Sequence, residues 1–235
     1  TPKPSRQRQM CIRDSSKTIV LPRLAEGMVI TLKLTFISGI FGLMLGMILA
    51  LMRISSFKVL NWFSVAYVTL FRGTPLLLQI LFIYFALPTI FSNYGIDMVI
   101  DSFPAGILAL SLNSAAYLAE IFRAGILSIP KGQSEAARAL GLSRHQTMYK
   151  IIIPQTYRRI IPPVVNELSA LTKETSLVSV ISLGELLYVT QRVGAKYLRV
   201  WEVYVWAALG YLIIVMVLSF IASRVENRLL QKGGV

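Results

Sequence analysis

Residues Gly132–Pro154 read GQSEAARALGLSRHQTMYKIIIP and form a polar, basic stretch between long apolar segments. Around it, Leu34–Met52 and Leu76–Tyr94 each contain 19 residues without a charge, and Val203–Ser223 contains 21. A helix needs about 20 apolar residues to cross a bilayer. A soluble-looking segment in such a chain indicates docking to a protein on one side of the membrane.

The composition predicts an all-α integral membrane protein. Of the 235 residues, 55% are hydrophobic, and the mean hydropathy is +0.64, whereas soluble domains are about 45–50% apolar. One cysteine and one histidine exclude internal disulfides and predict no metal site. No GxxxxGK[ST] loop occurs, so the chain is not expected to bind ATP in that way.

The net charge of +13 would suggest nucleic acid in a soluble protein. Here the basic residues lie between apolar segments, which is typical of cytoplasmic loops. We therefore expect no nucleic-acid partner.

Residues 1–16 differ from everything that follows. The segment is polar and basic and lacks the apolar region of a secretory signal. We interpret it as an unrelated stretch joined to the true start, with an ordinary disordered tail as the alternative. It is set aside together with Cys11, and residues 17–235 are expected to form a single transmembrane domain.

The first predicted span is Leu21–Arg53. Its glycines Gly39, Gly42 and Gly46 fall at spacings of three and four, which places them on one helix face. Such a face lets a neighbouring backbone approach closely, although glycines that merely face lipid are the alternative.

The next region combines a mixed segment, Phe57–Leu70, with the sequence Arg72-Gly73-Thr74-Pro75. The mixed segment either lies on the membrane surface or enters it. Gly73 loosens the chain and Pro75 removes a backbone donor, so a helix is expected to break there. The break is either a hinge or part of a binding site, because transporters use broken helices at such sites.

Charges in the loops predict the sidedness. Ser92–Ser102 contains no Lys or Arg and is expected outside, before a span at Phe103–Ile126. Between Arg123 and Arg159 there are seven Lys or Arg against the one acid, Glu135, so the loop 129–160 is expected in the cytoplasm.

Two further crossings follow from parity. Because the loop 129–160 and the basic C-terminal end are both inside, Pro162–Val189 and Val203–Ser223 each have to cross, with Thr190–Glu202 outside. About five spans result, and the N-terminus lies outside. Three cations on the outer segment run against the usual bias of charges: Arg192, Lys196 and Arg199.

Capping residues predict the local structure of the polar stretch. Ser134 is expected to cap a helix that starts at Glu135, and Gly141 suits the left-handed position after its end. Ser143 and Gln146 have the spacing of a capping box for a second short helix. The sequence therefore predicts a compact helix-turn-helix knob whose small side chains can enter a groove.

The spacing of Glu135-Ala136-Ala137, Gly141, Ile151 and Ile153-Pro154 resembles the EAA loop of ATP-binding cassette importer permeases, with Ile153 where Leu is usual. The resemblance covers about residues 20–230. Three further segments look like the polar amino-acid uptake branch of that family: Arg72-Gly73-Thr74-Pro75-Leu76-Leu77, Ala116-Tyr117-x-x-Glu120-Ile121-Phe122-Arg123 and Lys173-Glu174-Thr175-Ser176-Leu177.

The resemblance implies a multi-pass permease subunit of the bacterial inner membrane with five spans and no enzymatic activity or bound cofactor of its own. It implies a cytoplasmic ATPase pair that binds ATP, a second permease subunit, identical or homologous, and an extracytoplasmic solute-binding protein that delivers an amino acid. Transport would proceed by alternating access. The residues that would contact the ATPase are Glu135, Ala136, Ala137 and Gly141, with Arg138 at the rim.

Polar residues inside spans are candidates for the solute path, because each is costly in lipid. Asn113, Tyr117 and Glu120 share one helix face at i, i+4 and i+7. Glu120 could pair with the ammonium of an amino acid, or it could be a structural partner of Arg123 or Arg72. The complete candidate set is Gln79, Asn113, Tyr117, Glu120, Asn166, Ser169 and Thr172, with Gly73 and Pro75 as a hinge.

Two other functional classes compete with a transport subunit. A membrane enzyme is disfavoured because the chain has no HExxH motif and no nucleophilic Ser or Cys elbow. A self-contained secondary transporter or channel subunit for a small polar solute is the alternative, but it would leave the polar stretch without a purpose.

Overall fold

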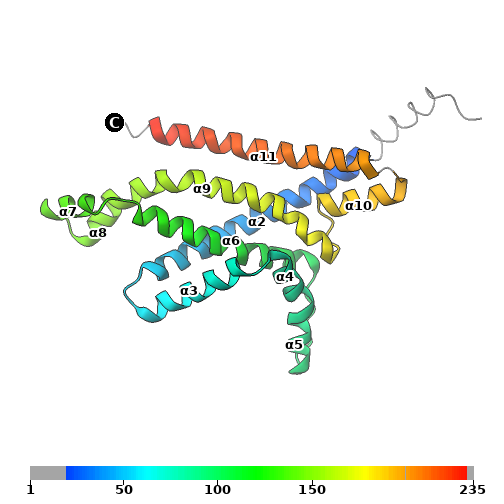
Figure 1. The fold of residues 1–235 in the computed structure, drawn as a ribbon, viewed down its shortest axis with the longest axis horizontal. Coiled ribbons are helices and arrows are strands. Elements are labelled where there is room, and N and C mark those ends of the chain that lie inside the picture. The colour runs from blue at the N-terminus through cyan, green and yellow to red at the C-terminus, as the bar shows by residue number, and fades with distance from the viewer. Residues whose placement is uncertain (1–19, 199, 232–235) are drawn as a thin grey trace, which may run out of the picture.

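The computed structural model describes residues 20–198 and 200–231, and this part of the chain is helical without a strand. The segment 1–16 lies outside the described residues. Figure 1 shows α9 and α11 running roughly along the long axis, with α2 and α3 inclined to them. In chain order they are α2 (Leu21–Ile54), α3 (Lys58–Gly73), α4 (Leu76–Leu81), α5 (Leu87–Asn93), α6 (Ser102–Leu127), α7 (Lys131–Ala139), α8 (Arg144–Thr147), α9 (Ile153–Glu174), α10 (Leu186–Tyr197) and α11 (Val200–Gln231).

Helices α2 and α6 form the central pair. A β-carbon on Gly46 would lie 2.8 Å from the Cβ of Leu118 and 3.1 Å from the carbonyl oxygen of Ala115, and one on Gly42 would lie 3.3 Å from Ser114. Gly39, one turn away, would meet Leu168 of α9 instead, at 2.9 Å. The predicted glycine face is confirmed: these residues allow close approach to protein and do not face lipid.

Helix α3 runs beside α2 and α6 (Figure 1). The hydroxyl of Ser64 donates to the carbonyl of Leu49 in α2 at 2.8 Å, and the hydroxyl of Tyr67 donates to the carbonyl of Leu112 in α6 at 2.8 Å. Its other side is apolar and exposed, notably at Trp62. The mixed segment, whose location the sequence left open, is therefore a helix packed along the bundle.

The predicted break is confirmed. Helix α3 ends at Gly73, Thr74 and Pro75 are extended, and α4 begins at Leu76. A π-helical segment, Phe82–Ala86, then connects α4 to α5, which points away from the other helices in Figure 1.

The boundaries of the predicted fourth span, Pro162–Val189, are wrong. Helix α9 begins earlier, at Ile153, and contains Pro162 and Pro163 inside it. It ends at Glu174, followed by a 3₁₀ segment, Thr175–Ile181, and Val189 belongs to α10. A proline is compatible with a helix start, but here the helix is already established when it reaches the pair.

Within the part of the chain that the structure describes, four helical stretches are long and apolar enough to cross a membrane: Leu21–Ile54, Leu76–Asn93, Ser102–Leu127 and Val200–Ile221. Helix α9 is too polar to meet that criterion, yet its 22 residues span roughly 33 Å, about the thickness of the hydrocarbon core. It runs between the end that carries α7 and α8 and the end that carries α10 (Figure 1). A fifth crossing at α9 stays a prediction.

The start of α2, helix α10 and the start of α11 share one apolar cluster, in which Leu24, Leu186 and Val203 are buried. These three segments therefore lie at one end of the molecule, opposite α7 and α8 (Figure 1). The sidedness predicted for Thr190–Glu202, outside the membrane, stays a prediction.

We predict that Gly46→Ala lowers the thermal stability of the detergent-solubilised protein, whereas Gly132→Ala does not. The added methyl group at Gly46 has to push α2 from the α6 backbone, and overpacking of this kind costs about 1–3 kcal/mol. Gly132 lies in α7 with open space around its Cα. Melting curves monitored by size-exclusion chromatography test this, and equal midpoints for Gly46→Ala and wild type would contradict the packing described here.

Candidate functional site

The two-helix knob, residues Lys131–Thr147, projects from one end of the molecule (Figure 1). Helix α7 ends at Ala139 with Leu140 as its C-cap residue, and Gly141 adopts a left-handed conformation with φ of 84°. The amide of Gly141 donates to the carbonyl of Arg138 at 3.0 Å, and the amide of Leu142 donates to that of Ala137 at 3.1 Å. This pair of bonds is the Schellman motif, so the predicted role of Gly141 is confirmed.

The predicted capping box is also confirmed. The amide of Gln146 donates to the Ser143 hydroxyl at 3.3 Å, and the amide of Ser143 donates to the Gln146 side chain at 2.9 Å. Both ends of the turn between α7 and α8 are thus fixed by local hydrogen bonds.

Two details of the predicted knob are wrong. Helix α7 begins at Lys131 after Pro130, so Ser134 lies inside it, and its hydroxyl donates to the carbonyl of Lys131. Pro130 supplies the earlier start. The second helix is not short either, because α8 continues through a π-helical segment, Met148–Ile152, directly into α9.

Four of the five residues predicted to contact an ATPase are exposed on the knob: Glu135, Ala136, Arg138 and Gly141. Ala137 is buried and holds the knob together instead. The structure adds two apolar side chains that the sequence reasoning missed, Leu140 at 82% and Tyr149 at 74% exposure. An apolar residue immediately before the capping glycine was the available signal for Leu140.

Gln79 and Asn113 meet at the break between α3 and α4. The amide nitrogen of Gln79 donates to the carbonyls of Phe71 and Thr74, at 2.9 and 3.1 Å. The amide nitrogen of Asn113 donates to the carbonyl of Phe71 at 3.2 Å and to the side-chain oxygen of Gln79 at 3.1 Å. The two amides therefore satisfy backbone groups that the helix break exposes.

Glu120 forms ion pairs with Arg53 of α2 at 2.5 Å and with Arg123 at 2.9 Å. Arg72 lies over the ring of Tyr117, with 5.1 Å between its Cζ and the ring centroid. Arg123, one of the two structural partners considered for Glu120, does pair with it. The other, Arg72, stacks on Tyr117 instead. The pair with Arg53 was missed, because the sequence does not show that the ends of α2 and α6 adjoin.

The three candidates on α9 differ in their surroundings. Asn166 is exposed. Thr172 is buried and donates to the carbonyl of Leu168 in its own helix at 2.9 Å. The hydroxyl of Ser169 is buried and finds no hydrogen-bond partner among the described residues.

The structure brings one further acid to this region. Glu167 accepts a hydrogen bond from the hydroxyl of Ser114 in α6 at 3.1 Å. Its place in the predicted fourth crossing was the only sequence signal. Gly73, the predicted hinge glycine, has open space around it and no positive φ, so the turn itself does not require glycine there. No cluster of potential metal ligands occurs among the described residues.

A family model described as the inner membrane component of binding-protein-dependent transport systems matches residues 42–232. The chain belongs to this family. It is thus a multi-pass permease subunit and not an enzyme, as the resemblance implied.

The permease is similar to named transport proteins over almost its whole length. It is 44% identical to an arginine transport system permease protein of Bacillus subtilis over 217 residues, which cover 92% of this chain and 97% of that protein. It is 40% identical to a glutamine transport system permease protein of Escherichia coli over 209 residues, with coverages of 89% and 94%.

Solved structures agree with the fold. An amino acid ABC transporter crystallised with histidines superposes with a TM-score of 0.83 at 38% identity, covering 91% of this chain and 97% of that one. A methionine ABC transporter in an inward-facing conformation gives a TM-score of 0.72 at 20% identity, with coverages of 89% and 97%, and supports the fold alone.

We predict that Glu120→Gln destabilises the permease by about 1–3 kcal/mol, because it leaves two partly buried arginines without a counter-charge. Glu26→Gln is the matched control. Its pair with Arg23 is exposed, at 67% and 65% of the side chains, and exposed pairs contribute little. Thermal unfolding in detergent tests this. Unchanged stability in Glu120→Gln, combined with a raised KM for uptake, would instead assign Glu120 to the solute.

The Gln79–Asn113 contact predicts coupling between substitutions. Gln79→Leu removes the side-chain donor to the carbonyl of Thr74, and Asn113→Leu leaves the side-chain oxygen of Gln79 without its donor. The contact between the two amides is lost in either single variant, so the double variant is expected to cost less than the sum of the two. The coupling energy should be about 0.5–3 kcal/mol. Thermal unfolding of the four proteins of the cycle measures it, and strictly additive losses would show that the two amides act separately.

Proposed function

We propose that this permease carries a polar amino acid across the inner membrane as part of an ATP-binding cassette importer. Permeases named for arginine, cystine and glutamine are 40–44% identical to it over most of their lengths. A solved amino acid ABC transporter is similar at 38% identity. These relatives support a polar amino acid as the solute class, and selectivity within that class is assigned to the binding protein.

The proposed assembly contains a cytoplasmic ATPase pair, a second permease subunit, identical or homologous, and an extracytoplasmic solute-binding protein. ATP binds to the ATPase pair, and this chain carries no cofactor of its own. The exposed residues Glu135, Ala136, Arg138 and Gly141 form the proposed contact with the ATPase, and Leu140 and Tyr149 add apolar area to it. Ala137 contributes by fixing the shape of the knob.

One observation carries the coupling mechanism: the knob is continuous with α9. From Arg144 to Glu174 the backbone is helical without a break, through α8, the segment Met148–Ile152 and α9. A displacement of the knob by ATP-driven closure of the ATPases is therefore transmitted along one rod. That rod packs against α6, α2 and α11, so its movement shifts the bundle between inward-open and outward-open arrangements.

The solute path is proposed along α6 and α9. The buried hydroxyl of Ser169 has no hydrogen-bond partner among the residues that the structure describes, and Asn166 is exposed, so both are available to a solute. Gln79, Asn113 and Glu120 already have protein partners, and Thr172 bonds its own helix. They shape the path, together with Tyr117, and the break at Gly73 and Pro75 serves as its hinge.

Gly141→Asp is expected to abolish uptake and association with the ATPase while leaving membrane insertion intact. A side chain at a positive φ is strained, and the new carboxylate projects from the docking surface. Gly132→Asp is the control, because Gly132 lies on the same knob with a negative φ and open space. Co-purification of the ATPase from membranes measures association. Equal recovery with Gly141→Asp and Gly132→Asp would overturn the docking assignment.

A further inference from the structure

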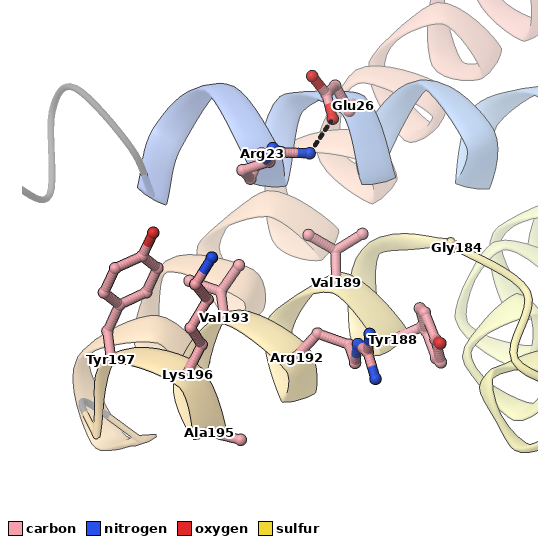
Figure 2. Close-up of a pocket in the computed structure, with 10 residues that line it drawn as sticks. All are labelled: Arg23, Glu26, Gly184, Tyr188, Val189, Arg192, Val193, Ala195, Lys196 and Tyr197. Atoms are coloured by element: carbon pink, nitrogen blue, oxygen red, sulfur yellow. Dashed lines mark ion pairs between the residues drawn. The ribbon is translucent and has the colours of Figure 1, made fainter.

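The end of the molecule opposite the knob, which is predicted to lie outside, carries a hollow of about 740 Å³ between the first turn of α2 and α10. Its charged lining consists of Arg23, Glu26, Arg192 and Lys196, with Tyr188 and Tyr197 beside them. Figure 2 shows Lys196 and Tyr197 extending from α10 toward the first turn of α2, whereas Arg192 lies along α10 next to Tyr188. We call these six residues the outer basic face.

Helix α10 is held rigidly behind this face. The carboxylate of Glu185 accepts hydrogen bonds from the amides of Leu187 and Tyr188, at 2.9 and 2.7 Å, and from the hydroxyl of Tyr211 in α11 at 2.6 Å. A β-carbon on Gly27 would lie 2.9 Å from the Cα of Leu186, so α2 and α10 touch through their backbones. The exposed cations are thus presented from a fixed support.

The outer basic face has an excess of positive charge. Arg23 is paired with Glu26 at 3.6 Å. Arg192 and Lys196 are exposed and form no ion pair with the described carboxylates. Each lies near an aromatic ring instead: Arg192 is 5.9 Å from the Tyr188 centroid, and Lys196 is 5.6 Å from that of Tyr197. Two cations therefore remain available to an external anion.

The position of these charges is unusual for a membrane protein. Lys and Arg near spans are concentrated on the cytoplasmic side, where the anionic leaflet also attracts them. The outer basic face lies at the end opposite the knob (Figure 1), which the predicted topology places outside. Neither the topology bias nor the cytoplasmic lipid potential accounts for it, which directs attention to an external partner.

An exposed leucine adjoins the outer basic face. Leu198 is the C-cap residue that follows α10; its φ is 54° and it is 89% exposed. A branched side chain in the left-handed region is strained, and such residues cluster at functional sites. An apolar side chain next to cations and tyrosines matches the composition of protein–protein contacts, where Tyr and Arg are enriched.

We infer that the outer basic face is a docking surface for an acidic patch on the solute-binding protein, with Arg192 and Lys196 as the principal cations. The inference rests on the proposed function. The surface is concave and rigid and has the apolar Leu198 beside it. These features favour a protein partner over lipid headgroups, because headgroups can bind to any diffuse positive charge. Complementary charge of this kind acts mainly on the rate of association and its dependence on salt.

The test uses the complete importer in nanodiscs and its cognate binding protein, identified beforehand as the one that stimulates the ATPase activity of the wild-type importer. Arg192→Glu with Lys196→Glu should weaken binding of that protein by at least about tenfold and flatten its salt dependence. Basal ATPase activity should not change. The charge-reversal control is Lys58→Glu, because Lys58 is exposed, far from α10 and outside the knob.

The outcomes separate the possibilities. The inference is supported if the Arg192→Glu, Lys196→Glu variant loses binding in nanodiscs of phosphatidylcholine alone. Changing acidic residues of the binding protein to lysine should then restore the binding. Unchanged binding overturns it, and so does a loss that appears only when phosphatidylglycerol is present, which would assign the outer basic face to anionic lipid. If no binding protein stimulates the wild-type importer, the proposed function itself fails.

Discussion

The close contact between the backbones of α2 and α6 is the constraint on which the rest of the permease depends. Where Gly46 meets Ala115 and Leu118, the two helices approach as closely as a missing β-carbon allows. Without a strong hydrophobic drive between helices in lipid, such packing and polar contacts hold a bundle together. Ser64 of α3 bonds α2, and Tyr67 bonds α6, so α3 is attached to the pair at two points.

Helix α9 also packs against both members of the pair, and Ile160 in its first half lies beside Gly125 of α6. Leu168 meets Gly39 of α2, and Glu167 accepts from Ser114 of α6. The opposite end of the rod is the knob, which is fixed by a Schellman motif and a capping box. A rigid end suits an element that moves as one body, because strain at the knob is not absorbed in its own turn.

How much the sequence predicts depends on how far apart the interacting residues are. The turn at Gly141 and the box at Ser143 and Gln146 involve neighbours within a few residues, and both were predicted correctly. The predicted start of α7 was wrong, because the helix begins directly after Pro130 and not after Ser134. The glycine face was predictable because its spacing alone defines it.

The candidate solute site was harder to predict for the same reason. Asn113 and Gln79 are 34 positions apart, and their bond exists only because the helix break lies against α6. Glu120 and Arg123 are neighbours on one helix, so that pair was foreseen, whereas Arg53 comes from the end of α2. Sequence reasoning can state that a polar group in a span needs a partner, but only the packing of helices identifies the partner.

The polar groups inside the bundle differ in whether they find a partner within the protein. A buried polar group stabilises the fold only if it is hydrogen-bonded, and a group without a partner is costly unless something else uses it. Most candidates meet this need inside the protein: Gln79 and Asn113 at the break, Glu120 with its arginines and Thr172 in its own helix. Ser169 does not, and it lies on the rod that begins at the knob. Under the proposed function, the two groups left for the solute, Ser169 and Asn166, are therefore both carried by the helix that the ATPase moves.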